Sequence, residues 1–257
     1  MLIQHTPQDG KLRRRRNDQA LRILVVASYN SAVDNIMERV HTLGIPDGNG
    51  GVIHPKMCRI ARHDYVPRQT LGQYLIRAFA ANYDGDNRAT PSLRARRQVA
   101  NECVIFFSTS SAAGSSQLKE LNQWFDVVIH DEAGNSLEGE TLVPLTAACT
   151  HRDLGFNRLF NFGIGDEKQL PALSLVTSML SGSRVVGQLP FDMKTINRSM
   201  FERLIYNNRT SFYFLDSQFR MHPAISRTTS PPFYNYFFRY PVPEENFTRI
   251  YTRPKEH

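Results

Sequence analysis

Two adjacent carboxylates, Asp131 and Glu132, directly follow a short apolar run in this chain. The run, Phe125–Ile129, has the length and composition of a buried strand, so its end would deliver both carboxylates into a turn. Ligands of open α/β sheets bind at the carboxyl ends of the strands. If the site belonged to a nucleotide hydrolase, the first carboxylate would hold Mg²⁺, and the second would orient or deprotonate a water molecule. Without further support, a strand that ends in Asp-Glu is more often a solvated turn.

A helical pattern follows the acidic pair and would hold the turn in place. Apolar residues recur at steps of three to five residues, at Leu137, Leu142, Leu145 and Ala148. Asn135 and Glu138 have the spacing of an N-cap residue and its N3 partner. The segment is therefore predicted to form a buried strand, an acidic turn and a helix.

Five segments together resemble the sequence motifs of superfamily 1 helicases. Asp131–Gly134 (DEAG) resembles their Walker B box, and Gly165–Pro171 (GDEKQLP) is similar to their GDxxQLP motif. Gln218–Pro223 (QFRMHP) resembles a third motif, written QYRMHP or QFRMHP. Upstream, Ala27–Asn35 matches the motif usually written APSNxAVDN, and Ser108–Ser115 matches a Ser/Gly loop.

The order and spacing of these motifs, with a further segment at Ser199–Leu204, fit one branch of the superfamily. It is the branch of the nonsense-mediated-decay helicase and senataxin. The resemblance covers roughly residues 22–240. It implies an α/β fold of the RecA-like P-loop NTPase type, ATP and Mg²⁺ as cofactors, single-stranded RNA or DNA as the partner, and a cytoplasmic or nuclear location.

The resemblance also assigns roles to single residues. In the complete family architecture, Asp131 would ligate Mg²⁺ and Glu132 would activate water. Gln169 would sense the γ-phosphate and relay its presence to the nucleic-acid site, and Arg220 would act as an arginine finger from a second domain. Each role has a plainer alternative, since a glutamine in a turn is usually a surface residue and an arginine can bind carbonyls of its own domain.

The nucleic-acid contacts implied by the resemblance lie in two loops, at Ser28, Asn30, Ser110, Gly114 and Ser115. The first loop comes just before a predicted helix, whose free N-terminal amides would suit a phosphate. The small residues of the second loop would let backbone amides approach a phosphate closely. The alternatives are that Ser and Asn merely start a helix and that the Ser-rich turn is a flexible connection.

Other elements follow from apolar periodicity. A strand is expected at Ile23–Ala27, and Ser31 and Asp34 then have the spacing of a capping box. The helix that follows is indicated by apolar residues at Val33, Ile36, Met37, Val40 and Leu43. Further strands are expected at 104–107, 159–164 and 212–215, and further helices at 71–81 and 201–205.

The expected organisation begins with a basic N-terminal segment, residues 1–22. This segment would be a nuclear address, a nucleic-acid arm or a charged helix end. Residues 23–190 would form a partial RecA-like domain, in which residues 44–100 hold an abbreviated insertion or stalk. Residues 181–198 would include a linker, and residues 199–257 would begin a second RecA-like domain.

No phosphate loop of the form GxxxxGKS or GxxxxGKT occurs in the 257 residues. In the related helicases this loop precedes the strand that matches Ile23–Ala27, and further motifs follow the arginine that matches Arg220, so we expect both ends to be cut. We therefore expect little ATP hydrolysis by this chain alone, uncovered apolar sheet edges, and protein partners that supply missing regions.

The function expected from these observations is that of a helicase-family ATPase region, as a fragment or a degenerate copy. One alternative is a non-catalytic nucleic-acid-binding or interaction module derived from a helicase. Another is a truncated chain with no independent role.

Composition sets looser bounds. The net charge of +7 and the pI of about 9.5 favour a polyanionic partner without requiring one. The cysteines, Cys58, Cys103 and Cys149, form no CxxC pair, and no apolar run has the length of a membrane-spanning helix. His130 stands where the family usually has an aliphatic residue, and Ala172 where a second proline is common. We expect this histidine to be a hydrogen-bonded neighbour of the acidic pair rather than a catalyst.

Overall fold

The computed structural model describes residues 21–62, 64–76, 91–149, 159–172, 174, 197–207, 213–234 and 238–241. The chain divides into two compact units, Met1–Arg203 and Leu204–His257. Nearly all of the predicted basic segment 1–22 and of the predicted linker 181–198 lies outside the described residues. None of the described helices is both long and apolar enough to cross a membrane.

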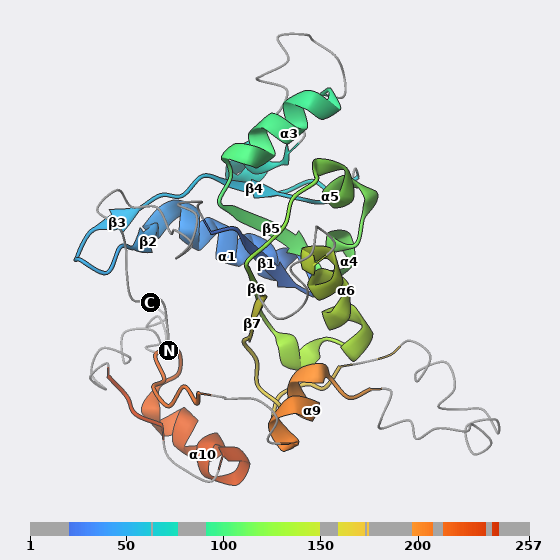
Figure 1. Ribbon diagram of the computed structural model, residues 1–257. Coiled ribbons are helices and arrows are strands. Elements are labelled where there is room, and N and C mark those ends of the chain that lie inside the picture. The colour runs from blue at the N-terminus through green and yellow to red at the C-terminus, as the bar shows by residue number, and fades with distance from the viewer. Residues whose placement is uncertain are drawn as a thin grey trace, which may run out of the picture. The chain divides into compact units, whose positions relative to one another are not determined.

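The first unit is built on a five-stranded sheet (Figure 1). In spatial order its strands are β4 (Met57–Arg59), β5 (Ile105–Thr109), β1 (Ile23–Ala27), β6 (Val127–His130) and β7 (Phe160–Gly163). Every neighbouring pair is parallel, so all carboxyl ends lie at one edge of the sheet. The strands predicted at 23–27, 104–107, 125–129 and 159–164 are confirmed.

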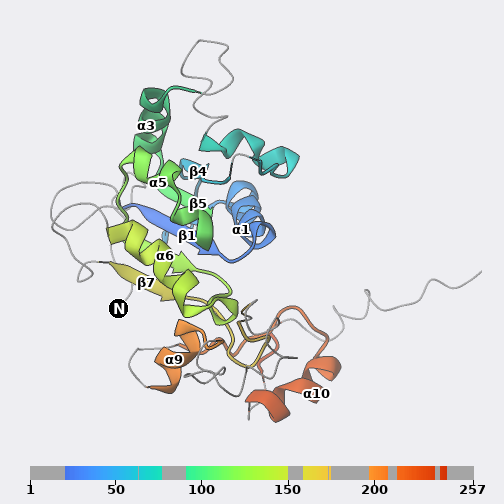
Figure 2. The same ribbon diagram turned by 90° about the vertical axis from the view of Figure 1, so that its right-hand side faces the viewer.

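Helices cover both faces of this sheet, because the strand side chains alternate between two apolar clusters. Leu24 and Val26 belong to one cluster, Val25 and Ala27 to the other. The first face is covered by α3 (Leu93–Glu102), α4 (Ser110–Ala113), α5 (Ser116–Leu121) and α6 (Glu138–Cys149). The second is covered by α1 (Asn30–Leu43) and the 3₁₀ helix η1 (Gln69–Tyr74). Figure 2 shows α1 on one side of the sheet and α3 and α5 on the other. The predicted α/β class is confirmed, and the sheet forms the middle of three layers.

β7 is an edge strand with unusual exposure. Within the described residues no strand pairs with its outer side, and all four of its residues are exposed. Phe160 is 65% exposed and Phe162 40%. Apolar side chains on an open sheet edge normally require a cover, and such an edge is what the sequence led us to expect.

One prediction for the segment between α1 and α3 needs correction. The helix predicted at 71–81 is a 3₁₀ helix over Gln69–Tyr74, and residues 77–81 lie outside the described residues. Within the expected abbreviated insertion, the short strands β2 (Ile45–Pro46) and β3 (Val52–Ile53) pair antiparallel. The turn between them is possible because Gly48 and Gly50 adopt positive φ angles of 82° and 90°.

The capping box predicted at the start of α1 is wrong. The N-cap residue is Tyr29, and no side chain caps the helix. Asp34 instead faces the interior, where it accepts a hydrogen bond from the Tyr65 hydroxyl and lies 3.6 Å from Nε of Arg59. A buried guanidinium binds this carboxylate more strongly than an exposed backbone amide would.

In the second unit, α10 spans Pro223–Tyr234. The helix predicted at 201–205 is confirmed as α9 (Met200–Tyr206), which crosses the boundary between the units. The strand predicted at 212–215 is wrong for its described residues, 213–215, which form no strand. Among the described residues of this region, an isolated parallel bridge pairs Ser217 with Arg239. The rings of Phe214 and Phe238 are stacked at a centroid distance of 6.4 Å.

Candidate functional site

The acidic pair lies where the sequence predicts it, immediately after β6. The Asp131 backbone N–H donates to the Val26 carbonyl at 2.8 Å, which holds the turn beside the end of β1. Asp131 is half-buried, and this burial raises the pKa of its carboxyl, while a hydrogen bond with the Glu132 backbone opposes the rise. Glu132 is exposed and left-handed, with φ 53° and ψ 38°. Such a conformation is uncommon outside glycine and is typical of functional turns.

The helix after the acidic pair starts later than predicted and with other caps. Ala133–Asn135 form a 3₁₀ turn, and α6 begins only at Glu138. The predicted pairing of Asn135 with Glu138 is wrong, because Asn135 donates to the Glu132 carboxylate at 3.2 Å instead. Glu140 takes the capping role by accepting from the Leu137 N–H at 3.2 Å.

The loops after β6 and β7 are in direct backbone contact. The Ala133 N–H donates to the Ile164 carbonyl at 2.8 Å. A Cβ on Gly134 would lie 2.9 Å from the Asp166 carbonyl oxygen, and one on Gly165 would lie 2.7 Å from the Gly134 nitrogen. Because these distances exclude a side chain, the two glycines permit the contact. The loop that carries Gln169 is thereby fixed against the turn that carries the carboxylates.

Gln169 is exposed and held within its own loop. Its Nε2 donates to Oδ2 of Asp166 at 2.8 Å, and Oδ1 of Asp166 accepts from the Lys168 N–H at 2.9 Å. Asp131, Glu132 and Gln169 therefore belong to one pair of contacting loops at the carboxyl edge of the sheet. The arrangement offers carboxylates for a cation and for water, and an amide beside them.

The loop after β1 carries the first set of predicted nucleic-acid contacts. Asn30 is exposed, and its Oδ1 accepts a hydrogen bond from Nη2 of Arg59 at 2.7 Å. Arg59 itself is fully buried beside Asp34 and Tyr65. Since a guanidinium can only donate, this bond fixes which end of the amide is oxygen. The NH₂ group of Asn30 then remains as the donor for a ligand.

Sequence reasoning missed Arg59. The available signal was an arginine inside an apolar segment, Met57–Ala61, which no solvated strand face would explain. A buried arginine needs a buried acid, and the sequence did not point to Asp34 as that acid, because its spacing from Ser31 predicted a helix cap. Burial lowers the pKa of Arg59, while Asp34 and Tyr65 raise it.

The predicted Ser/Gly loop, Ser108–Ser115, contains the end of β5 and the short helix α4, and it ends at the N-cap residue of α5. Ser110 is only 2% exposed, and its hydroxyl lies 3.3 Å from Nε2 of His130 rather than facing solvent. A Cβ on Gly114 would lie 2.7 Å from a methyl group of Val143, so the glycine permits close packing. Ser115 is the N-cap residue of α5. Any role of Ser110 in nucleic-acid binding would therefore be indirect in this arrangement.

His130 is the last residue of β6 and is 1% exposed. Burial lowers the pKa of its imidazole to about 4, so the ring is uncharged at neutral pH. Nε2 lies 3.0 Å from the Ser136 hydroxyl, whereas Nδ1 has no hydrogen-bond partner among the described residues. His130 was expected to be hydrogen-bonded, and this is so for Nε2 but not for Nδ1.

Arg220 lies in the second unit, on a turn organised by Gln218. The Gln218 side-chain oxygen accepts from the N–H groups of Arg220 and Met221, and its Nε2 donates to the Met221 carbonyl at 2.7 Å. The Arg220 side chain is exposed. Its participation with Asp131, Glu132 and Gln169 in one site stays a prediction.

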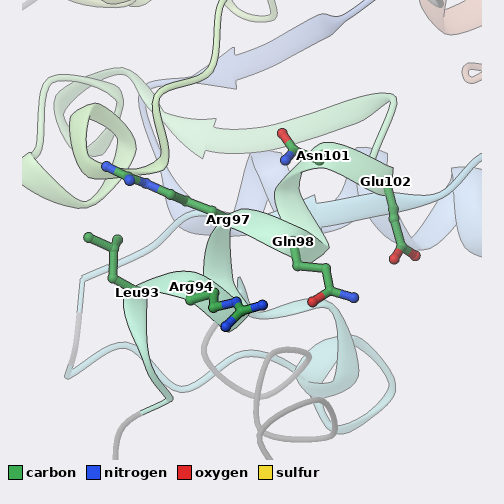
Figure 3. Close-up of a pocket in the computed structure, with 6 residues that line it drawn as sticks. All are labelled: Leu93, Arg94, Arg97, Gln98, Asn101 and Glu102. Carbon is green, nitrogen blue, oxygen red and sulfur yellow. The ribbon is translucent and has the colours of Figure 1, made fainter.

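A hollow among the described residues lies elsewhere, along α3 (Figure 3). It has a volume of about 660 Å³ and is lined by Leu93, Arg94, Arg97, Gln98, Asn101 and Glu102. Glu102 pairs with Lys56 just before β4, at the amino edge of the parallel sheet. The hollow is therefore not part of the carboxyl-edge site.

Comparison with known proteins gives this arrangement a family. A family model described as an AAA domain matches residues 76–177, and a second model with the same description matches residues 196–241. Probable helicase MAGATAMA 3 of Arabidopsis thaliana is 33% identical over 219 residues, which are 83% of this chain and 24% of that protein. The Regulator of nonsense transcripts 1 homolog of Neurospora crassa is 26% identical over 257 residues, covering 91% and 21%. Helicase SEN1 of Saccharomyces cerevisiae is 32% identical over 148 residues, covering 58% and 6%.

This chain belongs to the superfamily 1 helicases. It lies in the branch of the nonsense-mediated-decay helicase and senataxin, as its motifs indicate. The parallel sheet with helices on both faces is accordingly a RecA-like P-loop fold. The chain spans at most about a quarter of the length of these relatives.

The predicted site residues of this chain fall into both matched regions. Asp131, Glu132 and Gln169 fall within the first matched region, and Arg220 falls within the second. The first region thus supplies the contacting loops described above. The second matched region contains Arg220, on the turn that the Gln218 side chain holds by hydrogen bonds.

Proposed function

We propose that this chain is the ATPase region of a helicase that moves along single-stranded RNA or DNA, and that it hydrolyses little ATP by itself. The observation that carries the proposal is the shared carboxyl edge of β5, β1, β6 and β7. Parallel pairing sets the loops after these strands side by side, so the two predicted nucleic-acid loops adjoin the acidic turn and the glutamine loop. This adjacency would let nucleic-acid binding and nucleotide chemistry influence each other.

The proposed chemistry is phosphoryl transfer from ATP to water. Asp131 would hold Mg²⁺ through a carboxylate oxygen, and Glu132 would orient or deprotonate the attacking water. Among the described residues no three His, Cys, Asp or Glu side chains form a metal cluster. A single carboxylate fits Mg²⁺ nonetheless, because this ion commonly binds through one or two carboxylates and completes its shell with water and phosphate oxygens. Gln169 would contact the γ-phosphate, and Arg220 would stabilise its charge during transfer.

The residues present do not provide a cradle for the phosphates. No GxxxxGKS or GxxxxGKT segment occurs in the sequence, so the lysine, the hydroxyl and the amides of such a loop are missing from this chain. An arginine finger alone contributes about 10³ to 10⁵ in rate, and the loss of a whole loop should weigh at least as much. The exposed edge of β7 supports the same conclusion, since an additional strand would cover it. A partner polypeptide could supply both features.

For nucleic-acid binding we propose direct contacts from Ser28, Asn30, Gly114 and Ser115, with Ser110 acting from the interior. The strongest support comes from Asn30, whose amide is oriented by the buried Arg59. An amide NH₂ group held in this way is a donor for a phosphate oxygen. The net charge of +7 would favour the same partner. A cytoplasmic or nuclear location follows from the family as part of this proposal.

Two measurements on the purified chain test the proposal. The first is binding of a fluorescent single-stranded RNA at low salt. We expect Asn30→Ala to weaken binding about five- to tenfold, the effect of losing one hydrogen bond of ordinary strength. Asn35→Ala is the matched control, because Asn35 lies on the same helix and also accepts from an arginine, Arg68, at 2.7 Å. Equal affinities of the wild type and Asn30→Ala would remove Asn30 from the nucleic-acid site.

The second measurement is ATP hydrolysis with and without single-stranded RNA. We expect turnover close to background in both conditions. RNA-stimulated turnover that Glu132→Gln abolishes would show that the chain is a complete catalyst. RNA binding without turnover, even after a phosphate-loop segment is added in trans, would favour the second candidate function, a non-catalytic nucleic-acid-binding module.

A further inference from the structure

A small polar cluster lies beneath the carboxyl edge of the sheet, with His130 at its centre. Nε2 of His130 lies 3.0 Å from the Ser136 hydroxyl and 3.3 Å from the Ser110 hydroxyl. The Ser136 hydroxyl is also hydrogen-bonded to the Ser28 hydroxyl, at 2.5 Å. These four residues come from the segments after β1, after β5 and around the end of β6, so one cluster joins three loops.

The cluster is almost entirely buried. His130, Ser110 and Ser136 are 1%, 2% and 0% exposed, and Ser28 is half-buried. Asp131 follows His130 directly and is anchored to β1 through the Val26 carbonyl. A displacement of the Ser28 or Ser110 loop would therefore change hydrogen bonds that lead to the segment carrying the acidic turn.

A histidine at the end of β6 is a poor choice for stability alone. Its Nδ1 has no partner among the described residues, and a buried ring nitrogen without a partner costs free energy. An aliphatic side chain on the same strand would avoid this loss. What the imidazole adds is a hydrogen-bonding group between two hydroxyls.

The geometry also limits how that group can be shared. In the neutral imidazole, Nε2 carries either one proton or one lone pair, so it makes one strong hydrogen bond at a time. Ser110 and Ser136 therefore compete for it, at 3.3 Å and 3.0 Å. A change at either serine can therefore shift the hydrogen bond of Nε2 towards the other serine.

We propose that His130 is a positioning residue that couples the nucleic-acid loops to the acidic turn by exchanging its hydrogen bond between Ser110 and Ser136. The inference rests on the proposed function, since it takes the loops of Ser28 and Ser110 as the place where single-stranded nucleic acid binds. A strand that draws the Ser110 hydroxyl outward would leave Nε2 to Ser136. It would thereby tighten the turn that carries Asp131 and Glu132.

The test uses two substitutions at His130 and one at Ser136, each in the full chain. The measured quantity is the affinity for fluorescent single-stranded RNA. His130→Leu removes the hydrogen-bonding group, and we expect affinity to fall about five- to tenfold. Its melting temperature should change little, because the loss of the unpaired Nδ1 offsets the loss of a partner for the buried Ser110 hydroxyl. His130→Gln places an amide nitrogen near the position of Nε2 and should restore most of the affinity. Ser136→Ala, which removes only a hydroxyl, should weaken binding as His130→Leu does.

Ser108→Ala is the matched control, since Ser108 is a fully buried serine of β5 outside the cluster whose hydroxyl donates to the Thr109 carbonyl. Its affinity should equal that of the wild type. If the wild type binds RNA and both His130→Leu and Ser136→Ala bind it equally well, the inference is wrong. If His130→Gln folds but does not restore binding, the inference is also wrong. If the wild type does not bind RNA, the proposed function itself fails.

Discussion

The side-chain amide of Gln169 donates to Oδ2 of Asp166 at 2.8 Å, within the loop that follows β7. The other carboxylate oxygen of Asp166 accepts from the Lys168 N–H at 2.9 Å. One carboxylate thus shapes the loop backbone and orients the glutamine at once. The same residue contacts Gly134 through its backbone, so the orientation of Gln169 depends on the acidic turn.

Asp166→Ala should loosen this loop. Hydrogen exchange at the Lys168 amide should become about five- to tenfold faster, because the acceptor of its hydrogen bond is lost. Gln169→Ala is the matched control, since it removes the side-chain bond and leaves the Lys168 bond in place. Exchange that is equally fast in both variants would show that Asp166 does not organise the backbone.

The contact between the loops after β6 and β7 should be sensitive to a single methyl group. Gly134→Ala and Gly165→Ala place a Cβ within 2.9 Å and 2.7 Å of backbone atoms, so each should lower the free energy of unfolding by about 1–3 kcal/mol. Gly139→Ala, in α6, meets no atom within 4 Å and should raise it by up to about 1 kcal/mol. Urea unfolding midpoints measure all three. Unchanged midpoints for Gly134→Ala and Gly165→Ala would contradict the close approach.

Glu132 should be a site where stability and function oppose each other. Its left-handed conformation costs a residue with a Cβ about 1 kcal/mol. Glu132→Gly should therefore be more stable than Glu132→Ala by about that amount, although both remove the carboxylate. Thermal unfolding of the two variants measures the difference. Equal stability would mean that this backbone conformation carries no strain.

The ion pair between α6 and α9 should give a pH-dependent contribution. Arg203 donates to both carboxylate oxygens of Glu138, at 2.9 Å and 2.6 Å, and this hydrogen bonding lowers the pKa of Glu138. A lowered folded-state pKa means stabilisation that is complete above the unfolded value of about 4.3 and is lost as pH falls through the folded value. We therefore expect Glu138→Gln to have a lower melting temperature than the wild type at pH 7. The two melting temperatures should be equal once the pH is below the folded-state pKa of Glu138.

Melting curves across pH measure this effect, and Arg203→Lys provides the comparison. A lysine keeps the charge but cannot form two parallel hydrogen bonds, so its melting temperature should be intermediate at pH 7. A gap between Glu138→Gln and the wild type that does not change with pH would exclude ionisation of Glu138 as its cause.

Much of the first unit could be predicted from the sequence. The runs Ile23–Ala27 and Phe125–Ile129 are apolar, have strand length and end in turn residues, and each of them contains or overlaps a strand. The acidic pair follows β6 as predicted because its position depends only on where that strand ends. Local features such as these need no knowledge of distant residues.

The partners of the polar side chains were decided only by tertiary structure. Asp34 and Glu138 were both expected to cap helices, yet they bind Arg59 and Arg203. His130 meets Ser110 from the segment after β5 and Ser136 from the segment after its own strand, and among the described strands β7 lies at an open edge. Spacing along the chain fixes which groups are available and on which face of an element they lie. Which of them meet depends on strand order and on desolvation, since a buried charge or hydroxyl binds whatever partner the assembled sheet brings to it.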